Sequence, residues 1–160
     1  MAKYIEGNMR SISLDTAMAM GKQSKRTWWR RVSENVVQRT GSDSRGRTLV
    51  SMEDVLAFLS LPIEGDDIEM ILSADLGNAD AQNEAGQLFD EFGETNAALY
   101  WWRSAAERGS PDAMQHLGRC YLSGKGVPKD ENLGIMWTAK AASLGHVIAG
   151  FQIESLRPFR

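Results

Sequence analysis

The chain has 160 residues, of which 42% are hydrophobic, and a formal net charge of −3. This length can bury one modest core in each of two small domains, or one continuous core if the parts pack together, and we expect two domains. The sequence contains no apolar run long enough to cross a membrane. Residues 1–8 lack the apolar stretch of a secretory signal, so we expect a cytoplasmic protein.

Charge divides the chain into two parts. Residues 1–63 hold ten Lys and Arg against six Asp and Glu, a balance of +4, whereas residues 64–160 hold eight against fifteen, a balance of −7. We expect domains with these boundaries. The charge of the basic part favours binding of an anion, of which nucleic acid is the commonest large example. The acidic part is expected either to stay solvated or to bind a basic partner.

Two short helices joined by a tight turn are predicted between Ser13 and Glu34. Ser13 can cap the first helix and Ser24 the second, because a serine hydroxyl accepts a hydrogen bond from a free amide at a helix start. In the second helix, Trp28 and Val32 lie four residues apart, which places both toward the core.

A small hairpin is predicted after these helices, with strands over 36–39 and 47–50 around a polar turn. Ser51 then caps a final helix over 55–61, which Pro62 ends. The N-terminal part is therefore expected to consist of two helices, a hairpin and a third helix.

This order of elements over residues 11–61 resembles the small winged helix-turn-helix domains of the excisionase and MerR-like superfamily. Arg31 and Asn35 depart from that pattern, since an aromatic residue and a glycine are frequent there. The resemblance implies a second helix in the DNA major groove and a hairpin on the backbone or minor groove. The basic residues that would make these contacts are Lys25, Arg26, Arg30, Arg39, Arg45 and Arg47. The alternative is that they are ordinary solvated side chains.

The C-terminal part contains a repeated pattern. The clearer copy reads Ala113, Leu117, Gly118, Tyr121, Gly124, Gly126, Trp137, Ala141, Ala142 and Gly145, and a degraded copy reads Ala81, Ala85, Gly86, Phe89, Trp101, Ala105, Ala106 and Gly109. The spacing from Trp to Ala-Ala to Gly is identical in both copies. Periods in the thirties indicate a helix pair that is stable only when stacked on its neighbours.

This pattern resembles the Sel-one-like repeat, a relative of the tetratricopeptide repeat whose members are protein-interaction scaffolds. The predicted fold is mainly α, a short α/α solenoid of about two full repeats plus partial ones, preceded by the small winged domain. Its predicted helices cover 66–76, 79–90, 96–108, 111–122, 131–143 and 147–156. We expect the last helix to be a polar cap that Arg157-Pro158 ends.

Packing in this solenoid follows from residue size. Gly118 and the Ala141-Ala142 pair allow helices to cross closely. Trp101 and Trp137 are in register and are expected to fill equivalent spaces in the core, so truncation of either to Ala should cost about 3 to 5 kcal/mol.

Partner-binding positions are predicted from helical phase. In related solenoids the first helix of each pair lines the concave surface, and Asn83, Gln87, Gln115 and Arg119 lie off the predicted packing stripe of these helices. Trp102 follows a core Trp and is either a partly exposed partner anchor or a core residue.

The sequence carries no pattern typical of an enzyme, and we expect no cofactor and no metal site. A single cysteine, Cys120, excludes an internal disulfide or a zinc cluster, and its repeat position favours a buried thiol. His116 and His146 lack a second metal-type ligand at helical spacing.

Three functional hypotheses remain open. The first is a cytoplasmic regulator whose winged domain binds DNA while the acidic solenoid binds a protein. The second is a pure protein-interaction module, an adaptor or inhibitor of an effector or secretion component. The third is an autoinhibited or dimeric protein in which the acidic solenoid covers the basic domain of its own or a second chain.

Overall fold

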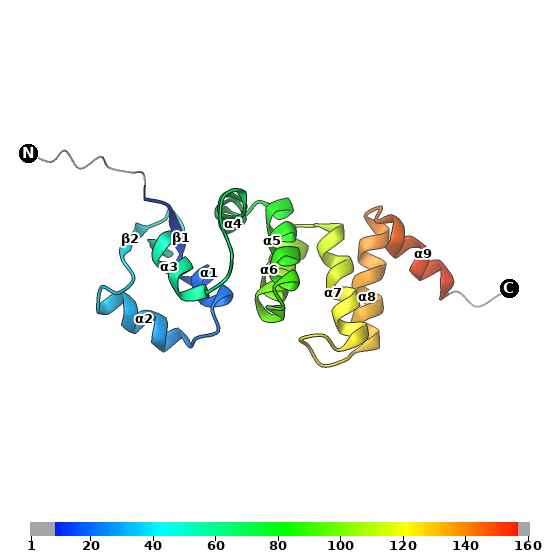
Figure 1. Cartoon of the computed structure of the whole chain (residues 1–160). Coiled ribbons are helices and arrows are strands. Elements are labelled where there is room, and N and C mark those ends of the chain that lie inside the picture. The colour runs from blue at the N-terminus through cyan, green and yellow to red at the C-terminus, as the bar shows by residue number, and fades with distance from the viewer. Residues whose placement is uncertain (1–8, 157–160) are drawn as a thin grey trace, which may run out of the picture. The chain divides into compact units, whose positions relative to one another are not determined.

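The computed structural model describes residues 9–156 and divides the chain into two compact units, one ending at Gly65 and the other beginning at Asp66. Figure 1 shows the elements of both. The two residues predicted to end the solenoid, Arg157 and Pro158, lie outside the described residues, as do residues 1–8.

The N-terminal unit combines a small antiparallel sheet with three helices. Its elements are β1 Ser11–Ser13, α1 Leu14–Met20, α2 Lys25–Ser33, β2 Arg39–Ser42, β3 Thr48–Ser51 and α3 Met52–Leu59, and the sheet order is β1-β3-β2. The three predicted serine caps are confirmed: the hydroxyls of Ser13, Ser24 and Ser51 each accept a hydrogen bond from the backbone amide three residues later. These caps fix where the helices begin.

The predicted first strand of the hairpin, over 36–39, is wrong, because β2 covers Arg39–Ser42. The strand β1 was not predicted. Val36 and Val37 do not pair in the sheet, because their amides both bond to the carbonyl of Arg31 and finish the end of α2. The hairpin loop is also tighter than expected. The Asp43 carboxylate accepts hydrogen bonds from the amides of Arg45 and Arg47, which lets β2 extend to Ser42.

Trp28 is the centre of this unit's core, as predicted, and is 1% exposed. Its ring meets Phe58 of α3 edge to face at a centroid distance of 6.1 Å. The guanidinium of Arg31 lies 3.7 Å from the Phe58 ring centroid and makes a cation–π contact with it. Arg31 stands where an aromatic residue is frequent in winged domains, and its guanidinium covers the Phe58 ring instead. Val32 is only half-buried.

The solenoid contains the predicted helices, with every end within about one residue of its expected position. They are α4 Asp66–Leu76, α5 Ala79–Glu91, α6 Thr95–Glu107, α7 Pro111–Ser123, α8 Glu131–Ser143 and α9 Val147–Ser155. The pairs α5–α6 and α7–α8 lie side by side in Figure 1. Within the solenoid α4 packs on α5, and α9 packs on α8.

Glycines set how closely the paired helices approach. A Cβ on Gly118 would lie 2.5 Å from the Thr138 hydroxyl and 3.1 Å from the carbonyl oxygen of Gly134. Gly86 likewise leaves room for the indole of Trp102. The predicted close crossing at Gly118 is therefore confirmed, because any side chain there would push α8 away from α7.

The end of the solenoid differs from two predictions. The last helix is not a polar cap, since Val147, Ile148 and Phe151 of α9 are 70%, 62% and 69% exposed. Trp137 is half-buried, whereas Trp101 is 1% exposed. The equivalence of the two Trp positions in sequence does not produce equal burial, because α8 has a complete helix pair on one side only.

Among the helices that the structure describes, none is both long and apolar enough to cross a membrane.

Candidate functional site

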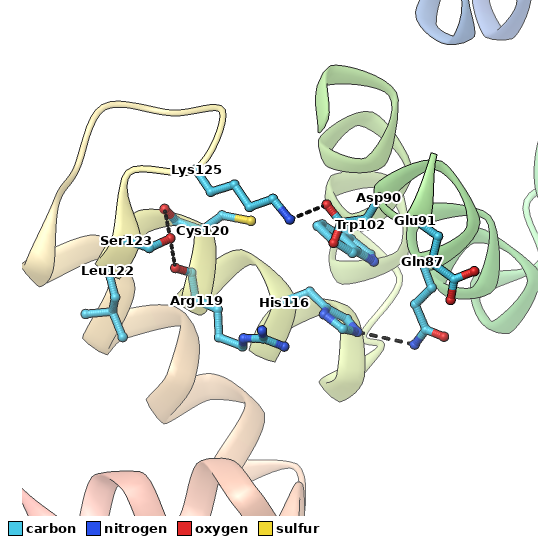
Figure 2. Close-up of a pocket in the computed structure, with 10 residues that line it drawn as sticks. All are labelled: Gln87, Asp90, Glu91, Trp102, His116, Arg119, Cys120, Leu122, Ser123 and Lys125. Atoms are coloured by element: carbon cyan, nitrogen blue, oxygen red, sulfur yellow. Dashed lines mark hydrogen bonds and ion pairs between the residues drawn. The ribbon is translucent and has the colours of Figure 1, made fainter. Parts of the chain in front are cut away.

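A pocket of about 480 Å³ opens on the solenoid where α5, α6 and α7 meet. Figure 2 shows the side chains around it. The first helices of the two full repeats supply most of the walls, and the turn after α7 supplies one side. The lining residues are Gln87, Asp90, Glu91, Trp102, His116, Arg119, Cys120, Leu122, Ser123 and Lys125.

An aromatic pair joins the two repeats at this pocket. The rings of Trp102 and His116 stack with a centroid distance of 4.5 Å and an interplanar angle of 7°. Trp102 reaches this place because Gly86 on α5 has no side chain to block its indole. Since Trp102 comes from one repeat and His116 from the next, their stack fixes the spacing between the repeats.

His116 is held in its neutral form. Burial lowers its pKa, and the nearby positive charge of Arg119 lowers the pKa further, against the opposing effect of Asp112 and Asp90. Its Nε2 lies 3.2 Å from the side-chain amide nitrogen of Gln87, which can donate to a neutral ring nitrogen. This bond ties α5 to α7 across the pocket.

An ion pair bounds the other side of the pocket. Lys125 Nζ lies 2.6 Å from Asp90 Oδ1, and thereby joins the turn after α7 to the end of α5. Cys120 lines the wall between them as a buried thiol whose pKa is raised by burial. A thiol with a raised pKa is a weak nucleophile at neutral pH, which agrees with a structural role.

The pocket gathers three of the five residues predicted to contact a partner. Gln87 and Arg119 are exposed at its mouth, whereas Trp102 lines the pocket but is only 3% exposed, with its ring stacked on His116. Asn83 and Gln115 were expected to lie off the packing stripe, but their side chains are buried, at 7% and 6% exposure. They do not line the pocket.

Gln115 is buried because its side chain is bonded to a neighbouring helix. The Gln115 amide nitrogen donates to Gln152 Oε1 of α9 over 2.7 Å, so this side chain is used inside the helix stack. Asp90, Lys125 and His116 line the pocket but were not predicted from the sequence as partner-binding residues. No local motif could have indicated them, because they come together only when two repeats stack.

The predicted nucleic-acid residues separate into two groups. Lys25, Arg26 and Arg30 lie exposed on α2, and none of the three forms an ion pair within residues 9–156. Trp29 lies between the two arginines in sequence and is 43% exposed.

The three hairpin arginines are engaged in local contacts. Arg47 Nε lies 2.8 Å from Asp43 Oδ2, and Arg45 Nε lies 4.0 Å from the same atom. The guanidinium of Arg39 donates to the Ser42 hydroxyl over 3.2 Å. Because Asp43 neutralises part of this charge, the hairpin offers less free positive charge than its sequence suggests.

Comparison with known proteins identifies the repeats. Residues 79–110 and 111–146 each match the Sel1 repeat, and the repeat resemblance of the C-terminal part is confirmed. A curated protein, chitin synthase regulatory factor 4 of Schizosaccharomyces pombe, is 33% identical over 86 residues, which cover 49% of this chain and 13% of that protein.

Solved structures support the same fold. A Sel1 repeat protein from Oxalobacter formigenes is similar with a TM-score of 0.53 and 30% identity, over 64% of this chain and 31% of that one. A protective antigen of uropathogenic Escherichia coli that displays an SLR fold has a TM-score of 0.50 and 30% identity, over 54% and 19%. The chain spans less than a third of each of these relatives.

Sel1 repeats are protein-interaction scaffolds, so the C-terminal unit carries a fold whose members bind protein partners.

Proposed function

We propose that this protein is a non-enzymatic adaptor or regulator, and that its solenoid binds a segment of a partner protein in the pocket between α5, α6 and α7. The observation that carries this proposal is the pocket itself, which joins two repeats and combines the half-buried Leu122 with exposed polar side chains at its mouth. Concave sites of this composition are the usual places for a ligand.

The chemistry of the pocket favours a peptide with both polar and apolar groups. Gln87 and Arg119 can form hydrogen bonds with a peptide backbone or a carboxylate, and Glu91 offers an opposite charge at the same mouth. The half-buried side chain of Leu122 in the same lining can contact an apolar side chain of the peptide. The adaptor hypothesis requires only this site. We propose that the protein acts in the cytoplasm, as expected from the sequence.

The test is selection of peptides from a random library against the full chain, followed by affinity measurements on variants. Arg119→Glu at the pocket mouth should weaken binding of the selected peptides roughly tenfold or more, as loss of a charged contact at a binding hot spot does. The matched control is Arg103→Glu, which makes the same charge change at an exposed position of α6 that does not line the pocket. Equal effects of both variants would contradict the proposed site.

We further propose that the N-terminal unit contacts nucleic acid through α2. Support comes from Lys25, Arg26 and Arg30, which share one exposed helix and form no ion pair within the described residues. The order β1, α1, α2, β2, β3, α3 also places a hairpin directly after that helix, as the resemblance to winged helix-turn-helix domains implies.

The measurement for this second function is fluorescence anisotropy of labelled mixed-sequence duplex DNA with the full chain at two salt concentrations. Binding should weaken steeply with salt and be lost in Arg26→Ala/Arg30→Ala, because phosphate contacts release counterions. Arg103→Ala serves as the charge control and should bind like the unmodified chain. Absence of binding at low salt would leave the pure protein-interaction module as the better hypothesis.

A further inference from the structure

Trp29 on α2 is the one tryptophan of this chain whose ring has no partner within the described residues. The chain contains five tryptophans. The rings of Trp28, Trp101, Trp102 and Trp137 each contact another ring or a cation. The Trp29 ring makes no such contact in residues 9–156, and the residue is 43% exposed. Part of a large flat ring therefore lies in solvent, where another flat group can cover it.

Positive charges border this ring. Lys25 and Arg26 lie four and three residues before Trp29, which places them on the same helix face with about 5 to 6 Å between Cβ atoms. Arg30 follows Trp29, and all three basic side chains are exposed. Residues 25–33 of α2 include no acidic residue, and the next one, Glu34, is the C-cap. None of these charged groups forms an ion pair within the described residues.

The combination fits the two parts of a nucleotide. A base offers a flat face that stacks on an aromatic ring, and its phosphate offers a negative charge to lysine or arginine. A base that lies on the Trp29 ring brings its phosphate within reach of long basic side chains one helical turn away. The ring and the cations are then used by the same ligand, which neither a plain anion nor an apolar side chain would achieve.

The exposed ring discriminates between forms of nucleic acid. In a duplex both faces of each base are covered by stacked neighbours, so a ring reaches a base face only after costly unstacking. In the major groove the indole would meet base edges that are mainly polar, to which it offers a single hydrogen-bond donor. In a single strand the base faces are free. The three cations serve either form, but the ring serves only the single strand.

We propose that this face of α2 binds single-stranded nucleic acid, with an unpaired base stacked on Trp29 and the neighbouring phosphates bound by Lys25, Arg26 and Arg30. This inference rests on the proposed nucleic-acid contact of α2 and specifies the form of the ligand. It differs from the groove binding that the resemblance to winged domains implies, because the base face is recognised and not the base edge. Duplex DNA keeps the phosphate contacts alone and binds more weakly.

The experiment is fluorescence anisotropy of the full chain with a labelled mixed-sequence single strand of about 12 nucleotides and with the duplex of the same sequence, at several salt concentrations. The single strand should bind more tightly than the duplex. Trp29→Leu should weaken single-strand binding roughly fivefold or more and leave duplex binding unchanged. It should not change the slope of log affinity against log salt, because the lost contact carries no charge, whereas Arg26→Ala should reduce that slope by about 0.7.

Two substitutions serve as controls. Trp29→Tyr keeps a flat ring and should bind nearly like the unmodified chain. Phe151→Leu makes a similar change at an aromatic residue of α9 that is 69% exposed, and it should have no effect. Circular dichroism checks that each variant is folded. A strand with abasic sites in place of its bases tests the stacking on the unmodified chain, and should bind as weakly as the intact strand binds to Trp29→Leu.

The source of the strand is separated by a single-stranded RNA of the same sequence, and tighter binding of either strand than of the duplex is the expected result. A duplex that binds as tightly as both single strands overturns this inference, as does an abasic strand that binds like the intact one. Each of these results leaves the nucleic-acid contact of α2 standing. Absence of binding to every form at low salt overturns that contact together with this inference.

Discussion

The two full repeats share the spacing from Trp to Ala-Ala to Gly, yet their tryptophans are buried to different extents. In the first, Trp101 is 1% exposed and Trp102 is buried beneath Gly86. In the second, Trp137 is half-buried, and the Lys140 ammonium lies over its ring, 4.7 Å from the centroid. The difference shows that burial in a solenoid depends on the neighbouring repeats as well as on the repeat itself.

The largest expected effect is the loss of an interior tryptophan. Trp101→Ala should lower the free energy of unfolding by about 3 to 5 kcal/mol, because it leaves a cavity where a fully buried ring lies. Trp137→Ala, the matched change in the second repeat, should lower it clearly less, since part of that ring already lies in solvent. Urea denaturation of both variants measures the two losses, and equal losses would mean that the repeats are equivalent after all.

A smaller effect is expected at the close crossing of α7 and α8. Gly118→Ala should destabilise the protein by about 1 to 3 kcal/mol, because the added methyl group overlaps the Thr138 hydroxyl and approaches the Gly134 carbonyl. Thermal unfolding followed by circular dichroism checks this. Unchanged stability would show that α8 can move away from α7 at little cost.

The opposite sign is expected at the end of the array. Gly150→Ala should stabilise the monomer by about 0.5 to 1 kcal/mol, because alanine is the better helix former and its methyl group enters open space. The measurement is chemical denaturation of the full chain and of the variant. A destabilised monomer would mean that Gly150 already faces another part of the chain.

The smallest expected effect concerns pH. Because burial lowers the pKa of His116, the unfolded chain binds a proton there before the folded chain does, so stability falls as pH drops below the ordinary histidine value of about 6.5. His116→Gln should reduce that loss below about pH 6.5. Denaturation at a series of pH values tests this, and an unchanged pH profile would show that His116 is not responsible.

Much of the fold could be predicted from the sequence, because the signals are local. Helix boundaries in the solenoid follow apolar periodicity and glycines at helix ends, such as Gly109 and Gly145, whose positive φ angles of 87° and 90° favour glycine. The caps at Ser13, Ser24 and Ser51 could likewise be predicted from residue type. The strand β1 could not, because three residues are too few to show a period.

The candidate site could be predicted only in part. Helical phase placed all four residues off the packing stripe, and Gln87 and Arg119 are exposed as expected, but Asn83 and Gln115 are buried. Small changes in how helices cross decide which of two adjacent positions is buried. His116 and Trp102 have no sequence relationship that indicates their stack.

The sequence by itself determined the repeat, its helices and the residues that allow close crossing, because these depend on spacing within about 36 residues. Only the tertiary structure decided which surfaces are buried and which are open. The pocket at Trp102 and His116 exists because two repeats stack there, and the apolar face of α9 is open because α9 has no second helix to pair with in the described structure. Both depend on neighbours rather than on the local sequence.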